Sequence, residues 1–236
     1  MSARLIVCLA ATVSVVTPAR AQLGDLGKRL GFGHSKAPSE DKIASGLKEA
    51  LHVGTGNAVL LTSKTDGYFK NDAIKIPMPP NLRGIEKSLR TVGYGRQVDE
   101  FILSMNRAAE RSAPLARDIF WNAITHMSFD DARQILSGPD TAATAYFRAK
   151  TSDTLTAAFR PVVEQSMNEV GATRYYEDLR KRAKSIPFVH AENYDINSYV
   201  VGKALDGLFH VLGEEERRIR TDPAARVTTL LQEVFH

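Results

Sequence analysis

The chain has 236 residues, 25% of them charged and 43% hydrophobic, with a formal net charge of +4. Nucleic-acid-binding domains usually gather their basic residues on one face, whereas here bases and acids are interleaved along the chain. We therefore expect no nucleic-acid partner. The length suffices for a sizeable core in one domain, and the single cysteine, Cys8, excludes a disulfide within the chain.

Residues 1–21 read as a cleaved secretory signal peptide. Arg4 precedes the apolar run LIVCLAATVSVV, and the sequence PARA at residues 18–21 supplies the small residues of a cleavage site. The run is shorter than the roughly 20 apolar residues of a stable bilayer span. We expect cleavage after Ala21 and a mature protein that begins at Gln22. It would be periplasmic or secreted, soluble after cleavage and without an integral membrane span, with 29 basic residues beside 27 acidic ones.

Residues 22–38, QLGDLGKRLGFGHSKAP, are glycine-rich and predict a flexible leader. Leu23, Leu26 and Leu30 recur at helical spacing, so a weak amphipathic contact with a membrane or a partner is the alternative. The glycines between them disfavour a stable helix.

Residues 39–236 predict a single all-α domain, a multi-helix bundle of roughly eight to ten helices. The first helix covers about residues 43–61, where apolar residues recur every three or four positions. A long irregular Pro-rich connection follows near residues 63–81, since its prolines forbid a helix. Asn81 is expected to cap the next helix, which ends at Gly93. Two further helical stretches meet at Pro114.

The second half of the chain carries clearer helix boundaries. Ser128 and Asp131 form a capping-box pattern for a short helix that Gly138 closes. Asp140 and Ser152 are expected to begin the next two helices, with a kink or break at Pro161. The remaining expected helices cover about residues 173–184, residues 195–220 and a last segment that begins at 222–223.

The chain is similar to a bacterial secreted family known as domain of unknown function 4197, over about residues 39–236. The segments that carry the resemblance are SGLKEALHVGTGNAV, AIKIPMPPNL, DEFILSMNRAAE, FDDARQIL, AATAYFR, GATRYYEDL, YVVGKALDGLFHVLGEEERRIR and DPAARVTTLLQEVF. The resemblance implies a helical protein of the bacterial envelope and transfers no catalytic residue. Some family members look like lipoproteins, whereas this sequence lacks a lipobox.

Motifs of known catalytic sites are absent from the sequence. It has no HExxH zinc helix, no GxSxG nucleophile elbow and no GxxxxGK[ST] phosphate loop. His126 with Asp130 and Asp131 suggests a metal site, but a new helix begins between them. His210 and Glu214 lie one turn apart within a polar stripe, which is typical of a solvated helix face. We therefore predict no catalytic residue, no metal and no cofactor.

Four polar residues beside apolar ones form the first candidate site. In DEFILSMNRAAE apolar side chains occupy two sides of the helix, so Asn106 and Glu110 would be buried and would need partners. Arg148 follows the aromatic residue Tyr146 by two positions. The four side chains either tie helices together by hydrogen bonds or line a polar binding pocket in the bundle.

Trp121, the only tryptophan, lies beyond the edge of the apolar face of its helix, among Arg117, Asp118 and Thr125. We expect it to be packed, as the second contact of a central helix. The alternative is an exposed indole that anchors a partner or ligand, which makes Trp121 the fifth candidate binding residue.

These observations favour a non-catalytic periplasmic protein that binds a partner protein or an envelope component through helical surfaces. Two alternatives stay open. One is a carrier or sensor of a small apolar ligand held between helices, which would need a wide internal cavity. The other is an enzyme with an unrecognised site, which would need Glu110 and Arg148 to converge in a cleft.

Overall fold

The computed structural model describes residues 40–169, 174, 176–178, 181 and 195–225. This part of the chain forms seven α-helices and three 3-10 helices and contains no strand, which confirms the all-α prediction. Seven α-helices are fewer than the eight to ten that we expected. The predicted cleavage site, the leader and most of the expected helix at residues 173–184 lie outside the described residues.

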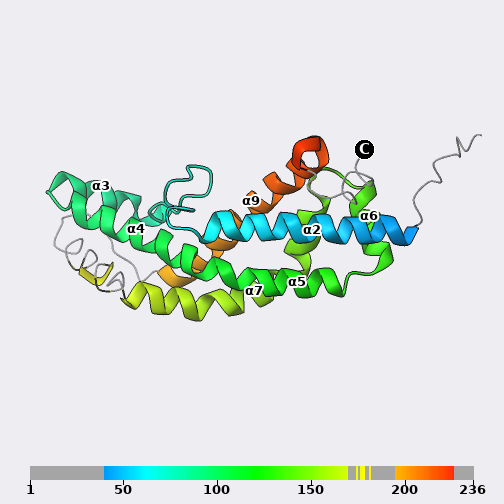
Figure 1. Ribbon diagram of the computed structural model, residues 1–236. Coiled ribbons are helices and arrows are strands. Elements are labelled where there is room, and N and C mark those ends of the chain that lie inside the picture. Colours follow the sequence, from blue (N-terminus) through cyan, green and yellow to red (C-terminus); the bar gives the residue numbers. More distant parts are fainter. Residues whose placement is uncertain (1–39, 170–173, 175, 179–180, 182–194, 226–236) are drawn as a thin grey trace, which may run out of the picture. The chain divides into compact units, whose positions relative to one another are not determined.

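The α-helices are α2 (Glu40–Ser63), α3 (Arg83–Thr91), α4 (Gly95–Ser112), α5 (Ala116–Thr125), α6 (Phe129–Ser137), α7 (Ala142–Glu169) and α9 (Ile196–Thr221) (Figure 1). The 3-10 helices are η1 (Pro80–Leu82), η2 (Ala113–Leu115) and η3 (Pro223–Ala225). None of the described helices is long and apolar enough to cross a membrane.

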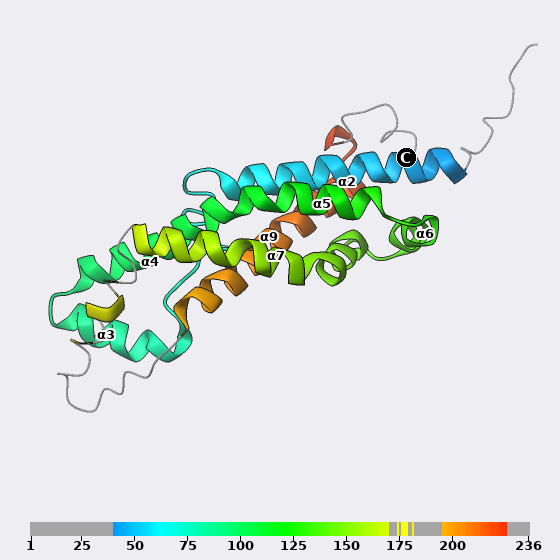
Figure 2. The same cartoon turned by 90° about the horizontal axis from the view of Figure 1, so that it is seen from below.

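Helix α9 lies at the centre of the packing, because it contacts α2, α4 and α7 (Figure 2). Its buried side chains therefore occupy more than one side of the helix. Those in the main cluster include Val200, Val201, Ala204, Leu205, Leu208, Phe209, Val211 and Leu212. The polar stripe from Tyr199 to Arg217 is exposed or half-buried, with ion pairs such as His210–Glu214 at 3.4 Å, as the sequence predicted.

Helices α4 and α5 follow one another across the short helix η2, which contains Pro114 (Figure 1). A proline lacks the N–H that would continue the α-helical pattern, so the chain tightens into a 3-10 turn there. The predicted meeting of two helical stretches at Pro114 is confirmed. Helix α5 then packs beside α2 on one side and α7 on the other.

The predicted capping box at Ser128 is confirmed, and the predicted cap at Asn81 is wrong. The Ser128 hydroxyl accepts a hydrogen bond from the N–H of Asp131 in a complete capping box, and Asp195 caps α9 through the N–H of Ser198. Asn81, in contrast, lies inside η1. The residue before α3 is Leu82, whose side chain has no polar atom and makes no cap, and the turn that begins at Pro80 leads the backbone into the helix.

Helix α7 is continuous from Ala142 to Glu169, so the predicted start at Ser152 is wrong, and Pro161 does not break the helix. The Ser152 hydroxyl donates to the carbonyl of Arg148 one turn earlier, which a serine inside a helix can do. Pro161 and Ala157 are both exposed. The Ala157 carbonyl that loses its helical donor to Pro161 can therefore bind water, which lowers the cost of the proline.

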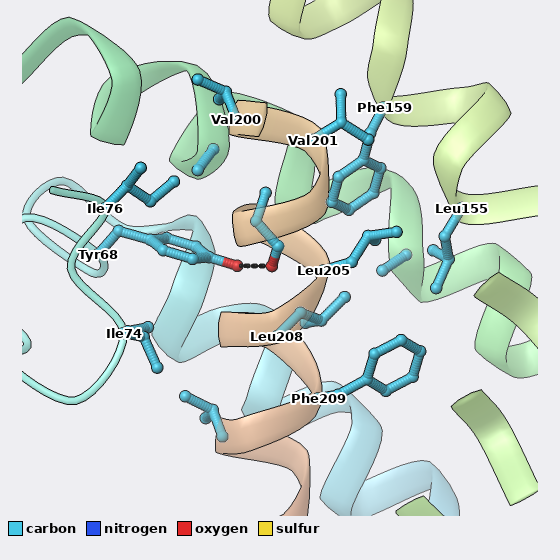
Figure 3. Packing of buried hydrophobic residues seen from close by; sticks show 14 of the residues in the cluster. Tyr68, Ile74, Ile76, Leu155, Phe159, Val200, Val201, Leu205, Leu208 and Phe209 are labelled. Carbon is cyan, nitrogen blue, oxygen red and sulfur yellow. Dashed lines mark hydrogen bonds between the residues drawn. The ribbon is translucent and has the colours of Figure 1, made fainter. Parts of the chain in front are cut away.

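Residues 64–79 connect α2 to η1 without helix or strand, as predicted for the Pro-rich connection, and we call this segment the strap. Its side chains Tyr68, Ile74 and Ile76 lie on one side of α9, and Leu155 and Phe159 of α7 lie on the other (Figure 3). All five side chains are buried in one continuous core. The strap is therefore a layer of the fold.

Candidate functional site

Asn106 of α4 binds the backbone of the strap at Ile76. The Asn106 amide donates to the Ile76 carbonyl (2.9 Å) and to the Ile102 carbonyl (2.8 Å), and its Oδ1 accepts from the Ile76 N–H (2.8 Å). The side chain is fully buried. The two bonds with Ile76 replace ones that the strap backbone would otherwise make with water, and the third joins Asn106 to its own helix, so Asn106 has the partners that its burial requires.

Glu110, one turn further along α4, binds the other end of the strap. Its Oε1 accepts from the N–H groups of Tyr68 (3.1 Å) and Phe69 (3.2 Å). Its Oε2 accepts from Arg107 at 2.6 Å, and Arg107 also donates to Asp66 at 2.6 Å. Asp66 has a φ of 67°, a left-handed conformation that begins the turn of the strap. The carboxylate of Glu110 is thus enclosed by donors, with 4% of the residue exposed.

Tyr68 carries the strap onto α9. Its hydroxyl donates to the Ala204 carbonyl at 2.6 Å (Figure 3), and the residue is fully buried. Burial raises the pKa of Tyr68, and the nearby negative charge of Glu110 raises it further. The phenol therefore stays protonated, as its donated hydrogen bond requires.

The polar atoms of Asn106 and Glu110 bind the backbone of the strap. These two side chains therefore have a structural role, which is the first of the two alternatives from the sequence. No hydrogen bond or ion pair joins either of them to Tyr146 or Arg148 within the described part of the chain. The structure therefore does not join these two residues to Tyr146 and Arg148 in one hydrogen-bonded site. The burial of Asn106 and Glu110 was predictable from apolar residues on two sides of α4; their partner, the strap, was not.

Trp121 is 53% exposed on α5, so the prediction that it packs between helices is wrong. One neighbour holds it: the imidazole of His52 on α2 lies with its ring centroid 3.9 Å from that of the indole, at 41°. The helices α2 and α5 run side by side here, and Lys48 donates to the Thr125 carbonyl at 3.5 Å. The indole thus contacts α2 through His52, and about half of the residue stays exposed.

The His52 ring is an unusual neighbour for an exposed tryptophan. Its Nδ1 is buried and has no hydrogen-bond partner among the described residues. Burial lowers the pKa of His52, and the positive charge of Lys48 lowers it further. The imidazole is therefore neutral at neutral pH, and the Trp121 ring lies against an uncharged surface.

A polar cleft of about 610 Å³ adjoins α5 and opens toward α6 and α7. Its lining includes Tyr146, the third predicted site residue, and Asp118, which is one turn before Trp121. Burial raises the pKa of the half-buried Tyr146, with a contribution from the charge of Asp131. The full lining is Asp118, Ile119, Asn122, Ala123, His126, Asp131, Tyr146, Lys150, Thr151 and Thr154.

Arg148 lies on another face of α7, away from this lining. Its guanidinium is 4.6 Å from the centre of the Phe209 ring, and its Nη1 lies 3.4 Å from a carboxylate oxygen of Asp206. Both partners belong to α9. Arg148 thus joins α7 to α9.

The acidic and histidine side chains do not gather into a metal site within the described residues. His126 Nδ1 lies 3.0 Å from the Asn122 carbonyl, and Asp131 is engaged by Ser128 in the capping box. Those hydrogen bonds from Ser128 also lower the pKa of Asp131. The Asp131 carboxylate is therefore already hydrogen-bonded at the start of α6.

One buried ionic contact was missed from the sequence. Glu216 of α9 accepts from the N–H groups of Ala143 (2.9 Å) and Thr144 (2.8 Å), so it caps α7 in place of the predicted Asp140. Arg220 pairs with Glu216 at 3.0 Å and donates to the Ile135 carbonyl at 2.9 Å. The contact joins the end of α6, the start of α7 and α9.

Comparison with known proteins gives one family. The family described as "Protein of unknown function (DUF4197)" matches the chain over residues 37–236. No match was found among curated proteins or among solved structures.

Proposed function

This chain belongs to the DUF4197 family, and we propose that it is a non-catalytic periplasmic protein that binds a partner protein through the outer surface of α5. We call this the α5 surface. It consists of Trp121 and the cleft that opens toward α6 and α7. The exposure of Trp121 is the observation that carries the proposal.

An exposed tryptophan is a costly feature for a protein without a partner. Tryptophan buries a large area with few rotatable bonds, and it is over-represented among residues that dominate interface affinity. Exposed aliphatic residues such as Leu60 are ordinary on soluble proteins and carry no such argument. The adjoining cleft adds hydrogen-bonding groups of Asn122 and Thr154, so the surface combines an apolar anchor with a polar surround.

The two alternative functions have less support. One apolar cavity, between α2, α7 and α9, is about 20 Å³, close to the space of one water molecule. An apolar ligand would not fit there. The arrangement that would favour an enzyme, Glu110 beside Arg148, does not occur, since Glu110 binds the strap and Arg148 binds α9.

Site-specific photocrosslinking in the native cell tests the proposal. A benzophenone amino acid placed at position 121 is expected to give one defined crosslinked product, identified by mass spectrometry. The same group at position 60 on α2, where Leu60 is more exposed than Trp121, is the matched control. The identified partner, once purified, should bind the wild-type protein, and Trp121→Ala should abolish that binding while the melting temperature changes little.

Two outcomes would contradict the proposal. One is a product of equal yield from positions 60 and 121, which would show only random encounters. The other is a Trp121→Ala variant that binds the purified partner as tightly as wild type. The proposed location has its own test, since exported protein should begin at Gln22 on N-terminal sequencing, and retention of Met1 would refute it.

A further inference from the structure

The described aromatic rings near the surface differ in whether a cation of the same chain lies over them. Phe129, the other exposed aromatic side chain, has the guanidinium of Arg133 5.0 Å from its ring centre. Lys75 lies 4.4 Å from the Phe69 ring, and Lys150 lies 5.7 Å from that of Tyr146. No cation of the described chain lies over Trp121, although indole attracts cations more strongly than phenyl or phenol rings.

The surroundings of Trp121 keep its open face available to a cation from another molecule. His52 covers part of the indole as a neutral ring, because burial lowers the pKa of His52. Lys48 on α2 has its ammonium 3.5 Å from the Thr125 carbonyl. Neither group supplies the positive charge that the indole would attract.

A carboxylate stands beside the same face. Asp118 lies three residues before Trp121, so both side chains project from neighbouring turns of α5. Asp118 is exposed, lines the cleft and makes no hydrogen bond or ion pair with any described residue. Asp131 adds a second carboxylate to the lining against the single ammonium of Lys150, so the cleft carries an excess of negative charge.

We propose that the α5 surface recognises a polypeptide partner through a lysine or arginine side chain, whose cation lies over the Trp121 indole and pairs with Asp118. The flanking backbone of the partner then occupies the cleft between α5 and α7. This inference rests on the proposed function and names the chemistry of the partner.

Binding of a defined peptide to the full mature chain tests the inference. The probe is acetyl-(Gly-Arg)₄-amide, and its control is the same peptide with citrulline, which has the shape of arginine without the charge. Trp121 is the only tryptophan, so its fluorescence reports binding, and calorimetry follows variants that lack it. We expect saturable binding of the arginine peptide that weakens with salt, and at least fivefold weaker binding of the citrulline peptide.

Variants of single side chains locate the contact. Asp118→Asn should weaken arginine-peptide binding about two- to fivefold, the range of an exposed ion pair. Asp72→Asn, an exposed aspartate on the strap, should leave it unchanged. Trp121→Phe should retain part of the affinity and Trp121→Ala should lose most of it. Arg117→Gln, which removes an exposed cation one turn before Trp121, should strengthen binding.

Four results would overturn the inference. Equal binding of the citrulline peptide would show that the positive charge is not recognised. Equal effects of Asp118→Asn and Asp72→Asn would show that Asp118 is not part of the binding site. A blue shift of Trp121 emission with phosphatidylethanolamine–phosphatidylglycerol vesicles, unaffected by Asp118→Asn, would assign the surface to lipid. A purified partner that requires Trp121 but binds equally well to Asp118→Asn would leave the proposed function standing and refute the basic contact alone.

Discussion

The ring of Tyr68 lies directly against Gly207: a β-carbon built on Gly207 would come within 2.5 Å of Tyr68 Cε1 and 3.1 Å of Ile74 Cβ. The tyrosine cannot move aside at low cost, because it is fully buried and its hydroxyl is bonded to Ala204. The absence of a side chain at position 207 is therefore what lets the strap approach α9.

Replacing Gly207 by alanine is expected to destabilise the protein by about 1 to 3 kcal/mol, the usual cost of overpacking a core. Gly202→Ala on the same helix is the matched control, since its β-carbon would meet no atom within 4 Å. That variant should gain up to about 1 kcal/mol from helix propensity. Urea unfolding measures both. A stabilised Gly207→Ala would show that the strap does not press on α9 as described.

Removing the charge of Glu216 should loosen the junction of α6, α7 and α9. Glu216→Gln leaves the N–H groups of Ala143 and Thr144 with a weaker acceptor and removes the carboxylate that pairs with Arg220. We expect a loss of about 3 kcal/mol in the free energy of unfolding. Glu214→Gln, at an exposed pair with His210, should change it by less than about 0.5 kcal/mol. Similar losses in both variants would contradict the assignment of Glu216 as the cap.

The strap should open when Asn106 is replaced by alanine. The change leaves the buried N–H and C=O of Ile76 without their partner, at a cost of about 2 to 4 kcal/mol. Trypsin should then cut faster after the exposed Lys70 and Lys75, as followed by mass spectrometry of the fragments. Asn122→Ala, on an exposed position, should leave the rate unchanged. Unaltered cleavage in Asn106→Ala would show that the strap is held by its apolar side chains alone.

Acidification should destabilise the protein through His52. Burial, and secondarily the charge of Lys48, lowers the pKa of His52 in the folded state below its unperturbed value of 6.5. Below about pH 6.5 the unfolded chain therefore binds more protons than the folded one, and stability falls as the pH falls. His52→Gln should reduce the loss measured by urea unfolding between pH 7.5 and 5.5, and His126→Gln, at an exposed position, should not. Equal losses in wild type and His52→Gln would refute this assignment.

The all-α fold and several boundaries were predictable because they depend on neighbouring residues. The capping box at Ser128 and the cap at Asp195 each need only a side chain and the N–H three residues later. A similar local pattern gave a wrong helix start at Ser152, because the Ser152 hydroxyl donates to a carbonyl inside a longer helix. A residue that can cap a helix does not by itself indicate that the preceding helix has ended.

The environment of a side chain could be predicted only where its own helix determines it. Apolar residues on two sides of α4 indicated that Asn106 is buried, and it is. Trp121 lies at the edge of a face, where its burial depends on which residue of α2 stands opposite, and that residue, His52, covers only part of the ring. Glu216 sits in a run of charges typical of a solvated helix, and the groups it binds are 72 and 73 residues earlier. No local pattern contains that information.

The position of α9 determines when the native structure can close as the chain is synthesised from its N-terminus. Tyr68 binds Ala204, and Asn57 binds Glu215, across separations of 136 and 158 residues. The strap and α2, in the first third of the chain, therefore cannot complete their packing until α9 has been synthesised. Before then they lack the surface that buries their apolar side chains. Contacts of such long range slow folding and leave apolar surface exposed in the interval. A chain truncated before Ile196 should therefore aggregate or require a chaperone.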